Sequence, residues 1–319
     1  MNEDIKDKIK GIIFGQAIGD ALGLGTEFLT KKQVAELYPD GYDYYDQMVR
    51  DKHRKRWAIG SWTDDTDQFL CVLDSLIENQ IVDELDIAKR FKNWLDSNGM
   101  GVGQTTYKVL NLPQYEKQPK KGAKLIWKIK KKSIAPNGGL MRNSILGTYK
   151  FWDTDEVIRN SISICELTHY DPRCKDSCAI VSSLIAAELN SQPISWDELN
   201  ISLDGYDKRI KEYTISPNDK IENLRLDESD SLGYTLKALN AGMWSYYNSN
   251  NFRESLLKII LEGGDADTNG CIVGSLLGAK FGYKSIPSQW IDGLLGKDIL
   301  EKKTAVYLEK LEHLMTSNQ

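Results

Sequence analysis

The stretch IKDKIKGIIFGQAIGDALGLGTEF, residues 5–28, decides the fold that the sequence predicts. Its apolar residues recur at intervals of three and four, which is the spacing of one helix face. They are Ile5, Ile9, Ile12, Ile13 and Ala17. The same spacing returns from Phe69 to Leu76 and from Ile180 to Leu189. Alternating runs rich in Val, Ile and Thr, which mark strands, are scarce. The sequence therefore predicts an almost entirely α-helical protein.

Glycines and two acids interrupt this first helical pattern. The glycines let two helices approach closely, or they let the backbone reach a ligand. Asp20 is expected to cap or pair, and Glu27 is placed to reach a metal. GLGTEF contains a G-x-G, but no predicted strand precedes it, so the segment does not predict a dinucleotide site.

The composition is that of an ordinary globular protein. The formal net charge of -5 over 319 residues gives no global case for binding nucleic acid or an anionic membrane. No apolar run approaches the roughly 20 residues of a membrane span, and a secretory signal is not indicated. Five irregularly spaced cysteines fit reduced thiols. Cys174 and Cys178 lie near His169, but a fourth zinc ligand is missing, so we favour core thiols. We expect a cytoplasmic monomer without membrane association.

The chain is expected to form one domain over residues 1–319. Capping residues before apolar runs predict helix starts at 63–65, 171–172 and 267–268. The segment from about 191 to 230 is polar, with Asn, Asp and Pro. We interpret it as a long excursion or a variable helical insertion.

The segment PKKGAKLIWKIKKK, residues 119–132, is strongly basic around Trp127. It could form a face that attracts phosphate. A solvated helix or loop whose Lys stems lie over apolar surface is more common for such a run, and it is the interpretation we favour.

The motif GGDADTNGC, residues 263–271, matches the first half of a calcium loop, D-x-[DN]-x-[DN]-G. The twelfth position of that loop is Leu276, where the pattern needs Glu. The residues after the motif also form an apolar helical run. These two observations argue against a calcium-binding hand.

A second motif, WTDDTDQFL at residues 62–70, places three acids at one predicted helix start. Asp and Thr at that position cap free amides and suit the helix dipole. Three acids within four residues exceed what capping needs, and their repulsion requires positive charge. A divalent cation supplies it, and two acidic clusters can share two metals about 3.5 to 4 Å apart. Because neither motif's ligands include His or Cys, Mg²⁺ or Mn²⁺ is favoured over zinc.

Together these motifs resemble the ADP-ribosylglycohydrolase family, which includes the dinitrogenase-reductase-activating glycohydrolases. The matching segments occur in the family's order and run to about Trp290. They are GQAIGDALGLGTEF, WTDDTDQFL, NGMGVGQTTYKVL, NGGLMRNSILG, ELTHYDP and EGGDADTNGCIVGSLLGAKFGYKSIPSQW. The resemblance implies a compact, single-domain, all-α orthogonal helical bundle. It also implies a binuclear Mg²⁺ or Mn²⁺ centre and hydrolysis of the N- or O-glycosidic bond between ADP-ribose and an acceptor.

Carried over position by position, the resemblance implies roles for individual residues. The two sets of metal ligands would be Thr63, Asp64 and Asp65, and Asp265, Asp267 and Thr268. Asp267 would bridge the metals, and Glu27 matches an acid that lies over them as a gate or ligand. Asp65 and Glu27 are both candidates for the catalytic general base. The substrate contacts would be Gly101, Val102, Gly103, Thr105, Asn137, Gly138, Gly139, Leu140, Met141, Arg142 and His169.

General chemistry supports these implied roles. The glycine loop at 101–103 exposes amides that can cradle a diphosphate, and the segment 137–142 offers amides and a cation. Cleavage at the anomeric carbon passes through an oxocarbenium-like state that nearby carboxylates stabilise. His169 could equally be a satisfied structural group, and Arg142 could be a salt-bridge partner on the surface.

One departure from the family concerns the acceptor. Some members, including arginine-directed ones, carry an acid just ahead of G-x-T-T, where this chain has Gly101 and Val102. Arginine as the acceptor is therefore in doubt. The main hypothesis is a Mg²⁺-dependent hydrolase that removes ADP-ribose from a protein, nucleic acid or small molecule. The alternatives are a non-catalytic ADP-ribose-binding or toxin-neutralising protein of the same fold, and a metal-dependent phosphohydrolase.

Overall fold

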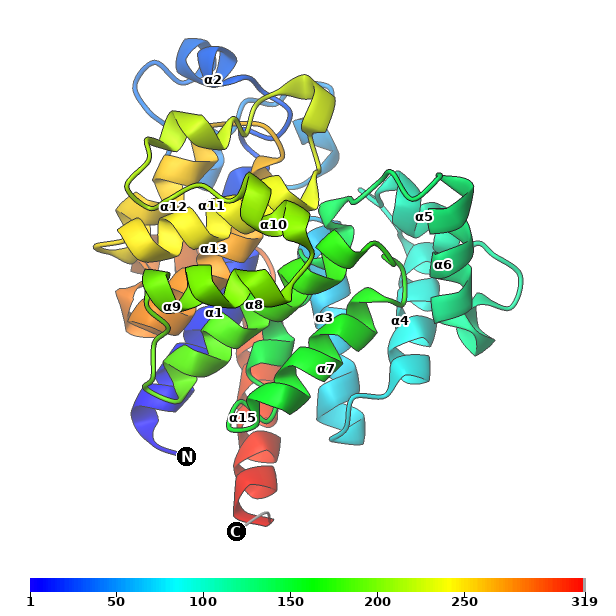
Figure 1. Cartoon of the computed structure of the whole chain (residues 1–319). Helices are drawn as coiled ribbons and strands as arrows, with labels where there is room; N and C mark the ends of the chain where they lie inside the picture. The colour runs from blue at the N-terminus through cyan, green and yellow to red at the C-terminus, as the bar shows by residue number, and fades with distance from the viewer. Residues whose placement is uncertain (318–319) are drawn as a thin grey trace.

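A computed structural model describes residues 1–317, and it shows an assembly of helices (Figure 1). The α-helices are, in chain order, α1 (Glu3–Gly23), α2 (Lys31–Leu37), α3 (Asp64–Asn79), α4 (Glu84–Ser97), α5 (Gln104–Leu110), α6 (Pro119–Ile129), α7 (Thr154–Cys165), α8 (Pro172–Leu189), α9 (Trp196–Ser202), α10 (Lys208–Tyr213), α11 (Thr235–Asn248), α12 (Phe252–Ile260), α13 (Ala266–Phe281), α14 (Ser288–Gly293) and α15 (Lys297–Ser317). No strand forms within the described residues, where a single isolated bridge joins Pro136 and Tyr234. The all-α prediction is confirmed.

The stretch that opens the sequence forms α1, and glycines bring it into backbone contact with α13. A Cβ added at Gly15 would lie 2.1 Å from the carbonyl oxygen of Gly274. A Cβ at Gly19 would lie 1.9 Å from the carbonyl oxygen of Gly270. These pairs run in opposite directions along the two helices, so the end of α1 meets the beginning of α13. Of the two roles expected for the glycines, close helix approach is the one that these four residues have.

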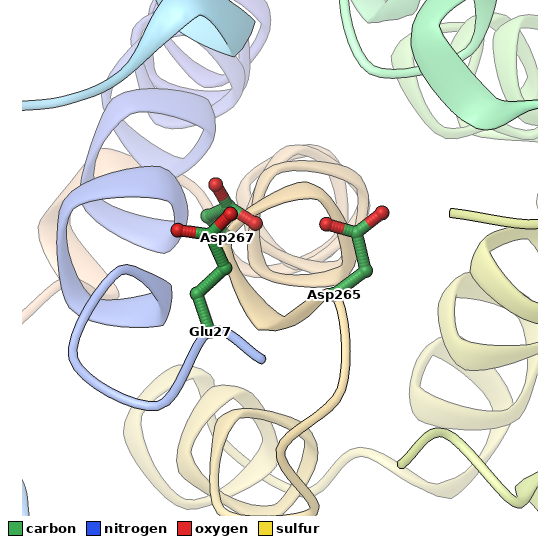
Figure 2. A group of neighbouring side chains, drawn as sticks. All are labelled: Glu27, Asp265 and Asp267. Carbon is green, nitrogen blue, oxygen red and sulfur yellow. The ribbon is translucent and has the colours of Figure 1, made fainter. Parts of the chain in front are cut away.

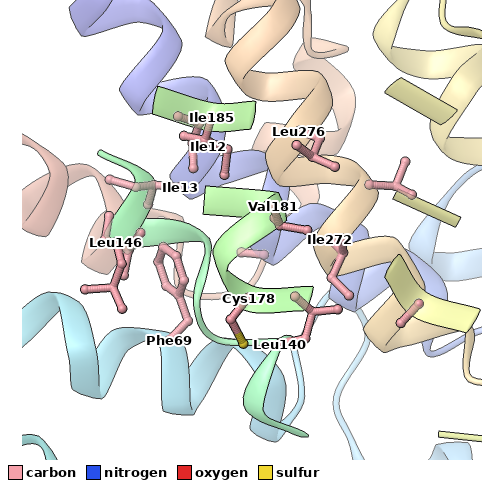
Figure 3. Close-up of a cluster of buried hydrophobic side chains, with 14 of the residues drawn as sticks. Ile12, Ile13, Phe69, Leu140, Leu146, Cys178, Val181, Ile185, Ile272 and Leu276 are labelled. Carbon is pink, nitrogen blue, oxygen red and sulfur yellow. The ribbon is translucent and has the colours of Figure 1, made fainter. Parts of the chain in front are cut away.

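The main core lies where α1 and α13 meet their neighbours α3, α8 and α11. Figure 3 shows side chains from several of these helices interdigitating in one cluster. Its labelled members are Ile12, Ile13, Phe69, Leu140, Leu146, Cys178, Val181, Ile185, Ile272 and Leu276. Because these helices are buried, any polar group at their ends must find a partner or a ligand.

Two of the three predicted helix starts agree with the structure. Thr63 caps α3 and Asp171 caps α8, each by accepting a backbone N–H with its side chain. The third helix, α13, begins at Ala266, so its N-cap position is Asp265, two residues before the predicted cap Asp267. Two glycines with φ of 74° and 73° turn the chain just before it, at Gly263 and Gly264, a conformation that glycine adopts without strain.

The polar segment at 191–230 forms short helices, including α9 and α10, and contributes buried apolar side chains. These are Leu199, Leu203, Ile210, Leu224 and Leu226. The segment is therefore partly helical and contributes to the core. Across residues 1–317, no helix combines the length and apolar character that a transmembrane span requires.

Candidate functional site

Three distant segments bring five acids to one place. Glu27 follows the end of α1, Asp64 and Asp65 occupy the first turn of α3, and Asp265 and Asp267 lie at the start of α13. Figure 2 shows the carboxylates of Glu27, Asp265 and Asp267 gathered beside the N-terminal end of α13. One ligand atom from each of these three lies within 4.8 Å of the other two. The contact between α1 and α13 produces this meeting.

The acids line a cleft of about 420 Å³. The predicted site residues that line it are Glu27, Asp64, Asp65, Gly101, Gly103, Thr105, Asn137, Gly138, Met141, His169, Asp265, Asp267 and Thr268. Its lining, taken over the described part of the chain, contains five carboxylates and neither Lys nor Arg. Two further predicted residues, Thr63 and Val102, line a smaller adjoining cavity of about 220 Å³.

Three predicted substrate contacts do not line either cavity. Gly139 faces the interior, where a Cβ would lie 2.8 Å from the Cys165 sulfur. Leu140 belongs to the hydrophobic core, and Arg142 is fully buried. The segment 137–142 forms tight turns, so Asn137, Gly138 and Met141 line the cleft while the other three residues do not. Sequence order alone could not separate those parts.

Arg142 is therefore neither a cleft cation nor a surface salt-bridge partner. Its guanidinium donates to Gln68 and to the Thr168 hydroxyl, and it stacks 4.2 Å from the centroid of the Phe91 ring. Burial lowers the pKa of Arg142. Arginine stays protonated in proteins, so the hydrogen bonds and the ring face must stabilise its charge.

His169 lines the cleft, and Thr168 connects it to Arg142. The Thr168 oxygen accepts from Arg142, which can only donate, and lies 2.7 Å from Nδ1 of His169. Burial, helped by Arg142, lowers the pKa of His169 to about 3. A neutral imidazole thus lies beside Gly138.

The charged form of these carboxylates is disfavoured by burial and by the neighbouring acids. Burial, followed by neighbouring acids, raises the pKa of Asp64, Asp65 and Asp267 well above the usual range. Burial also raises the pKa of Glu27 and Asp265. Partial relief comes from His53 Nε2, 2.6 Å from Glu27, and from Asn137, whose Nδ2 donates to Asp265 at 2.7 Å. Buried hard oxygen donors with so little positive charge around them fit a divalent cation such as Mg²⁺.

Asp67, the third acid of the α3 motif, has a different environment. It accepts the indole N–H of Trp62 at 2.9 Å and that of Trp94 at 3.0 Å. Only two of the three acids in this motif therefore face the cleft. The predicted repulsion among all three acids is therefore reduced at Asp67, whose indole partners are distant in sequence or not apparent from the motif.

Asp20, expected to cap or pair, holds the beginning of α3 against α1. Its carboxylate accepts the backbone N–H groups of Thr63 and Thr66, both at 3.0 Å, and the Thr66 hydroxyl at 2.6 Å. Burial raises the pKa of Asp20 to about 7, against the lowering effect of these bonds. Asp20 thus positions the Thr63-Asp64-Asp65 segment without lining the cleft.

Replacing Asp20 with alanine should destabilise the protein by about 2 to 4 kcal/mol, because buried donors at Thr63 and Thr66 would lose their acceptor. Urea unfolding followed by circular dichroism measures this free energy. Asp40→Ala, at an exposed carboxylate, is the matched control and should change stability by no more than about 0.5 kcal/mol. Equal effects of the two substitutions would contradict the positioning role.

The cysteines near His169 are buried free thiols. Cys174 contacts the carbonyl oxygen of Pro136 at 3.3 Å, and Cys165 contacts the His169 carbonyl oxygen at 3.5 Å. The Nδ1 atom of His169 is already engaged by Thr168. These contacts agree with core thiols rather than a zinc site.

Comparisons with known proteins agree with this geometry. An ADP-ribosylarginine hydrolase, Tri1, from Serratia proteamaculans is 28% identical, with the match covering 92% of this chain and 76% of the relative. An ADP-ribosyl-[dinitrogen reductase] glycohydrolase from Rhodospirillum rubrum is 24% identical, with 91% of each chain covered. A solved structure, an ADP-ribosylglycohydrolase-related protein complex, shares the fold with a TM-score of 0.72 at 22% identity. The match covers 97% of this chain and 100% of that one.

The sequence model of one family, described as ADP-ribosylglycohydrolase, matches residues 1–319, which is the whole chain. That match agrees with the all-α fold and with the acids gathered on the cleft. The chain belongs to the ADP-ribosylglycohydrolase family, a family of glycosyl hydrolases.

Proposed function

We propose that this protein is a Mg²⁺-dependent hydrolase that cleaves the glycosidic bond between ADP-ribose and an acceptor at a binuclear metal centre. The observation that carries the proposal is a cleft lined by five carboxylates and, within residues 1–317, by no Lys or Arg. Family membership supplies the reaction class. The relatives named for ADP-ribosylarginine and for dinitrogen reductase support an ADP-ribosylated protein as substrate.

The metal ligands in this proposal come from the ends of two helices. They are Thr63, Asp64 and Asp65 at α3, and Asp265, Asp267 and Thr268 at α13. Asp267 is the proposed bridge, as the family resemblance implies; it lines the same cleft as Asp64 and Asp65, and its ligand atom lies within 4.8 Å of those of Glu27 and Asp265. Two Mg²⁺ ions, or Mn²⁺ in their place, would neutralise these acids and act as Lewis acids toward the ribose.

The remaining cleft residues suit the rest of ADP-ribose. Backbone amides at 101–105 and at 137–138 are proposed to hold the diphosphate, and the neutral His169 ring is proposed to form a hydrogen bond with the substrate. The ribose then lies over the acids, and its anomeric carbon develops positive charge as the bond to the acceptor breaks. Glu27 and Asp65 both stay candidates for the general base that activates water.

The structure bears on which acceptor fits. A Cβ at Gly101 would lie 2.4 Å from Oδ1 of Asp64, and the φ of Gly101 is 95°, so an acidic side chain has no room there. The smaller cavity next to it is lined by Arg56 together with three carboxylates. Position 102 is Val, so neither position supplies the acid that arginine-directed members carry ahead of G-x-T-T. We expect serine-linked ADP-ribose to be the better substrate.

Turnover assays test the proposal. Serine-linked and arginine-linked ADP-ribosyl peptides and O-acetyl-ADP-ribose are each incubated with the protein, in Mg²⁺ or in EDTA, and free ADP-ribose is quantified by chromatography. We expect release only with Mg²⁺, and at least about tenfold slower release from arginine because positions 101 and 102 supply no acid to pair with the guanidinium. No turnover of any substrate would contradict a hydrolase. Release of AMP would indicate a phosphohydrolase, and calorimetric binding without turnover would indicate a binding protein.

Three further proposals concern organisation. We propose one domain over residues 1–319, a monomer and a cytoplasmic location. Free thiols at all five cysteines support a reducing compartment. Light scattering on the purified chain tests the monomer, and limited proteolysis tests the single domain.

A further inference from the structure

Charge is distributed very unevenly beside the cleft. Residues 104–135 contain nine Lys, a single acid at Glu116 and no Arg. Their formal charge is therefore +8 in a chain whose total is -5, which leaves -13 for all other residues. A net charge close to zero for the whole protein conceals this separation.

Eight of the nine lysines form what we call the lysine face. They are Lys108, Lys117, Lys121, Lys124, Lys128, Lys130, Lys131 and Lys132, and all are exposed. Figure 1 shows α5 and α6, which carry four of them, side by side at one edge of the molecule, and the other four lie in the segments that flank α6. Among the described residues, no carboxylate lies within 4.0 Å of any of the eight ammonium groups. The ninth, Lys120, differs because it pairs with Glu84 at 2.7 Å.

The lysine face begins at the mouth of the catalytic cleft. Lys108 and Lys130 line a second cavity of about 460 Å³. That cavity and the cleft share Gln104 and Thr105 at the start of α5. A long anion lying on the lysines could therefore present one of its groups to the cleft without leaving the face.

Several of these lysines occupy positions where they destabilise the local backbone conformation. Lys124 and Lys128 stand four residues apart on α6, and like charges at that spacing destabilise a helix. Lys131 and Lys132 follow with φ of 53° and 59°, a left-handed conformation in which glycine is preferred. On α4, by contrast, Arg90 pairs with two acids. A purely solvated helix has no need to exclude acids in this way.

We propose that the lysine face binds the phosphate backbone of a nucleic acid strand. Each lysine ammonium acts as a point charge that can donate to phosphate oxygens from many directions, and a row of exposed lysines suits the repeated phosphates of a strand. Tyr107, 53% exposed among the lysines, offers a surface on which a base can stack. Leu125 and Ile129 are also exposed, but two apolar side chains are too few to anchor a helix in a membrane.

Fluorescence anisotropy of the full chain with an unmodified, labelled single strand of about 20 nucleotides tests this binding. We expect affinity to fall as salt rises, with a log–log slope that shrinks by about 0.7 for each phosphate-contacting lysine removed. The double variant Lys124→Glu, Lys128→Glu should bind at least about tenfold more weakly. The control double variant Lys258→Glu, Lys302→Glu carries the same charge change on α12 and α15 and should stay within about twofold.

Equal losses in the two double variants would overturn the proposal, because only net charge would then matter. Tighter binding to polyglutamate would overturn it in favour of an acidic protein, and tighter binding to anionic vesicles in favour of a membrane. Thermal unfolding verifies that each variant folds, and Lys124→Gln, Lys128→Gln gives an intermediate loss if charge reversal is not tolerated. Since the strand carries no ADP-ribose, the result is independent of the proposed hydrolysis.

Discussion

Replacing Asp267 with alanine is expected to abolish ADP-ribose release while the helical fold persists. The side chain lies in the first turn of α13, with ligand atoms of Glu27 and Asp265 within 4.8 Å. As the proposed bridge, it contributes to both metal positions, so its loss removes more than one ligand bond. We expect turnover to fall by at least about a thousandfold. The release assay measures this, and circular dichroism verifies the fold.

A second measurement separates metal binding from chemistry. Mg²⁺ should raise the unfolding temperature of the unchanged protein, and EDTA should reverse the effect, because a ligand of the folded state stabilises it. Asp267→Ala should lose this Mg²⁺-dependent shift. In EDTA the variant should be at least as stable as the parent, because it removes one of the buried, mutually repelling acids.

Asp67→Asn is the matched control for this substitution. Asp67 belongs to an acidic motif of the same centre, yet its carboxylate accepts the indole N–H groups of Trp62 and Trp94 instead of facing the cleft. We expect its turnover to stay within about threefold of the parent. Full activity of Asp267→Ala would contradict the bridging role. Equal losses in both variants would show that charge in the region, rather than a ligand position, controls turnover.

Local signals made much of the fold predictable from sequence. Thr63 and Asp171 are capping residues directly before apolar runs, and both helices begin where this chemistry predicts. The two acidic motifs also meet as expected, because each lies at a helix start and their helices pack on a common core. At α13 the N-cap position is Asp265, two residues before the predicted cap, and the Asp265 side chain makes no capping hydrogen bond.

The partners of the site residues could not be predicted in the same way. Asp20 reaches Thr63 and Thr66 across 43 and 46 residues, and Arg142 reaches Thr168 across 26. Such contacts depend on how helices pack, and periodicity carries no information about which polar groups then meet. This is why Arg142 was predicted to line the cleft, although its side chain is fully buried and does not line the cleft.

Replacing Gly274 with alanine should destabilise the protein by about 3 kcal/mol or more, the reverse of what this substitution does in an ordinary helix. Alanine normally favours a helix over glycine by about 1 kcal/mol. At position 274, however, a Cβ would lie 2.0 Å from the carbonyl oxygen of Gly15 and 2.7 Å from its carbonyl carbon. Both are backbone atoms of α1, so relief requires the two helices to separate. Urea unfolding measures the change in free energy.

Separation of α1 from α13 should also disturb the site, because Glu27 follows the first helix and Asp267 begins the second. The stabilisation by Mg²⁺ should therefore shrink in Gly274→Ala. Gly205→Ala is the control, since nothing lies within 4 Å of a Cβ there, and it should change stability by no more than about 1 kcal/mol. If Gly274→Ala instead stabilised the protein, the backbone contact between α1 and α13 could not be what brings the acids together.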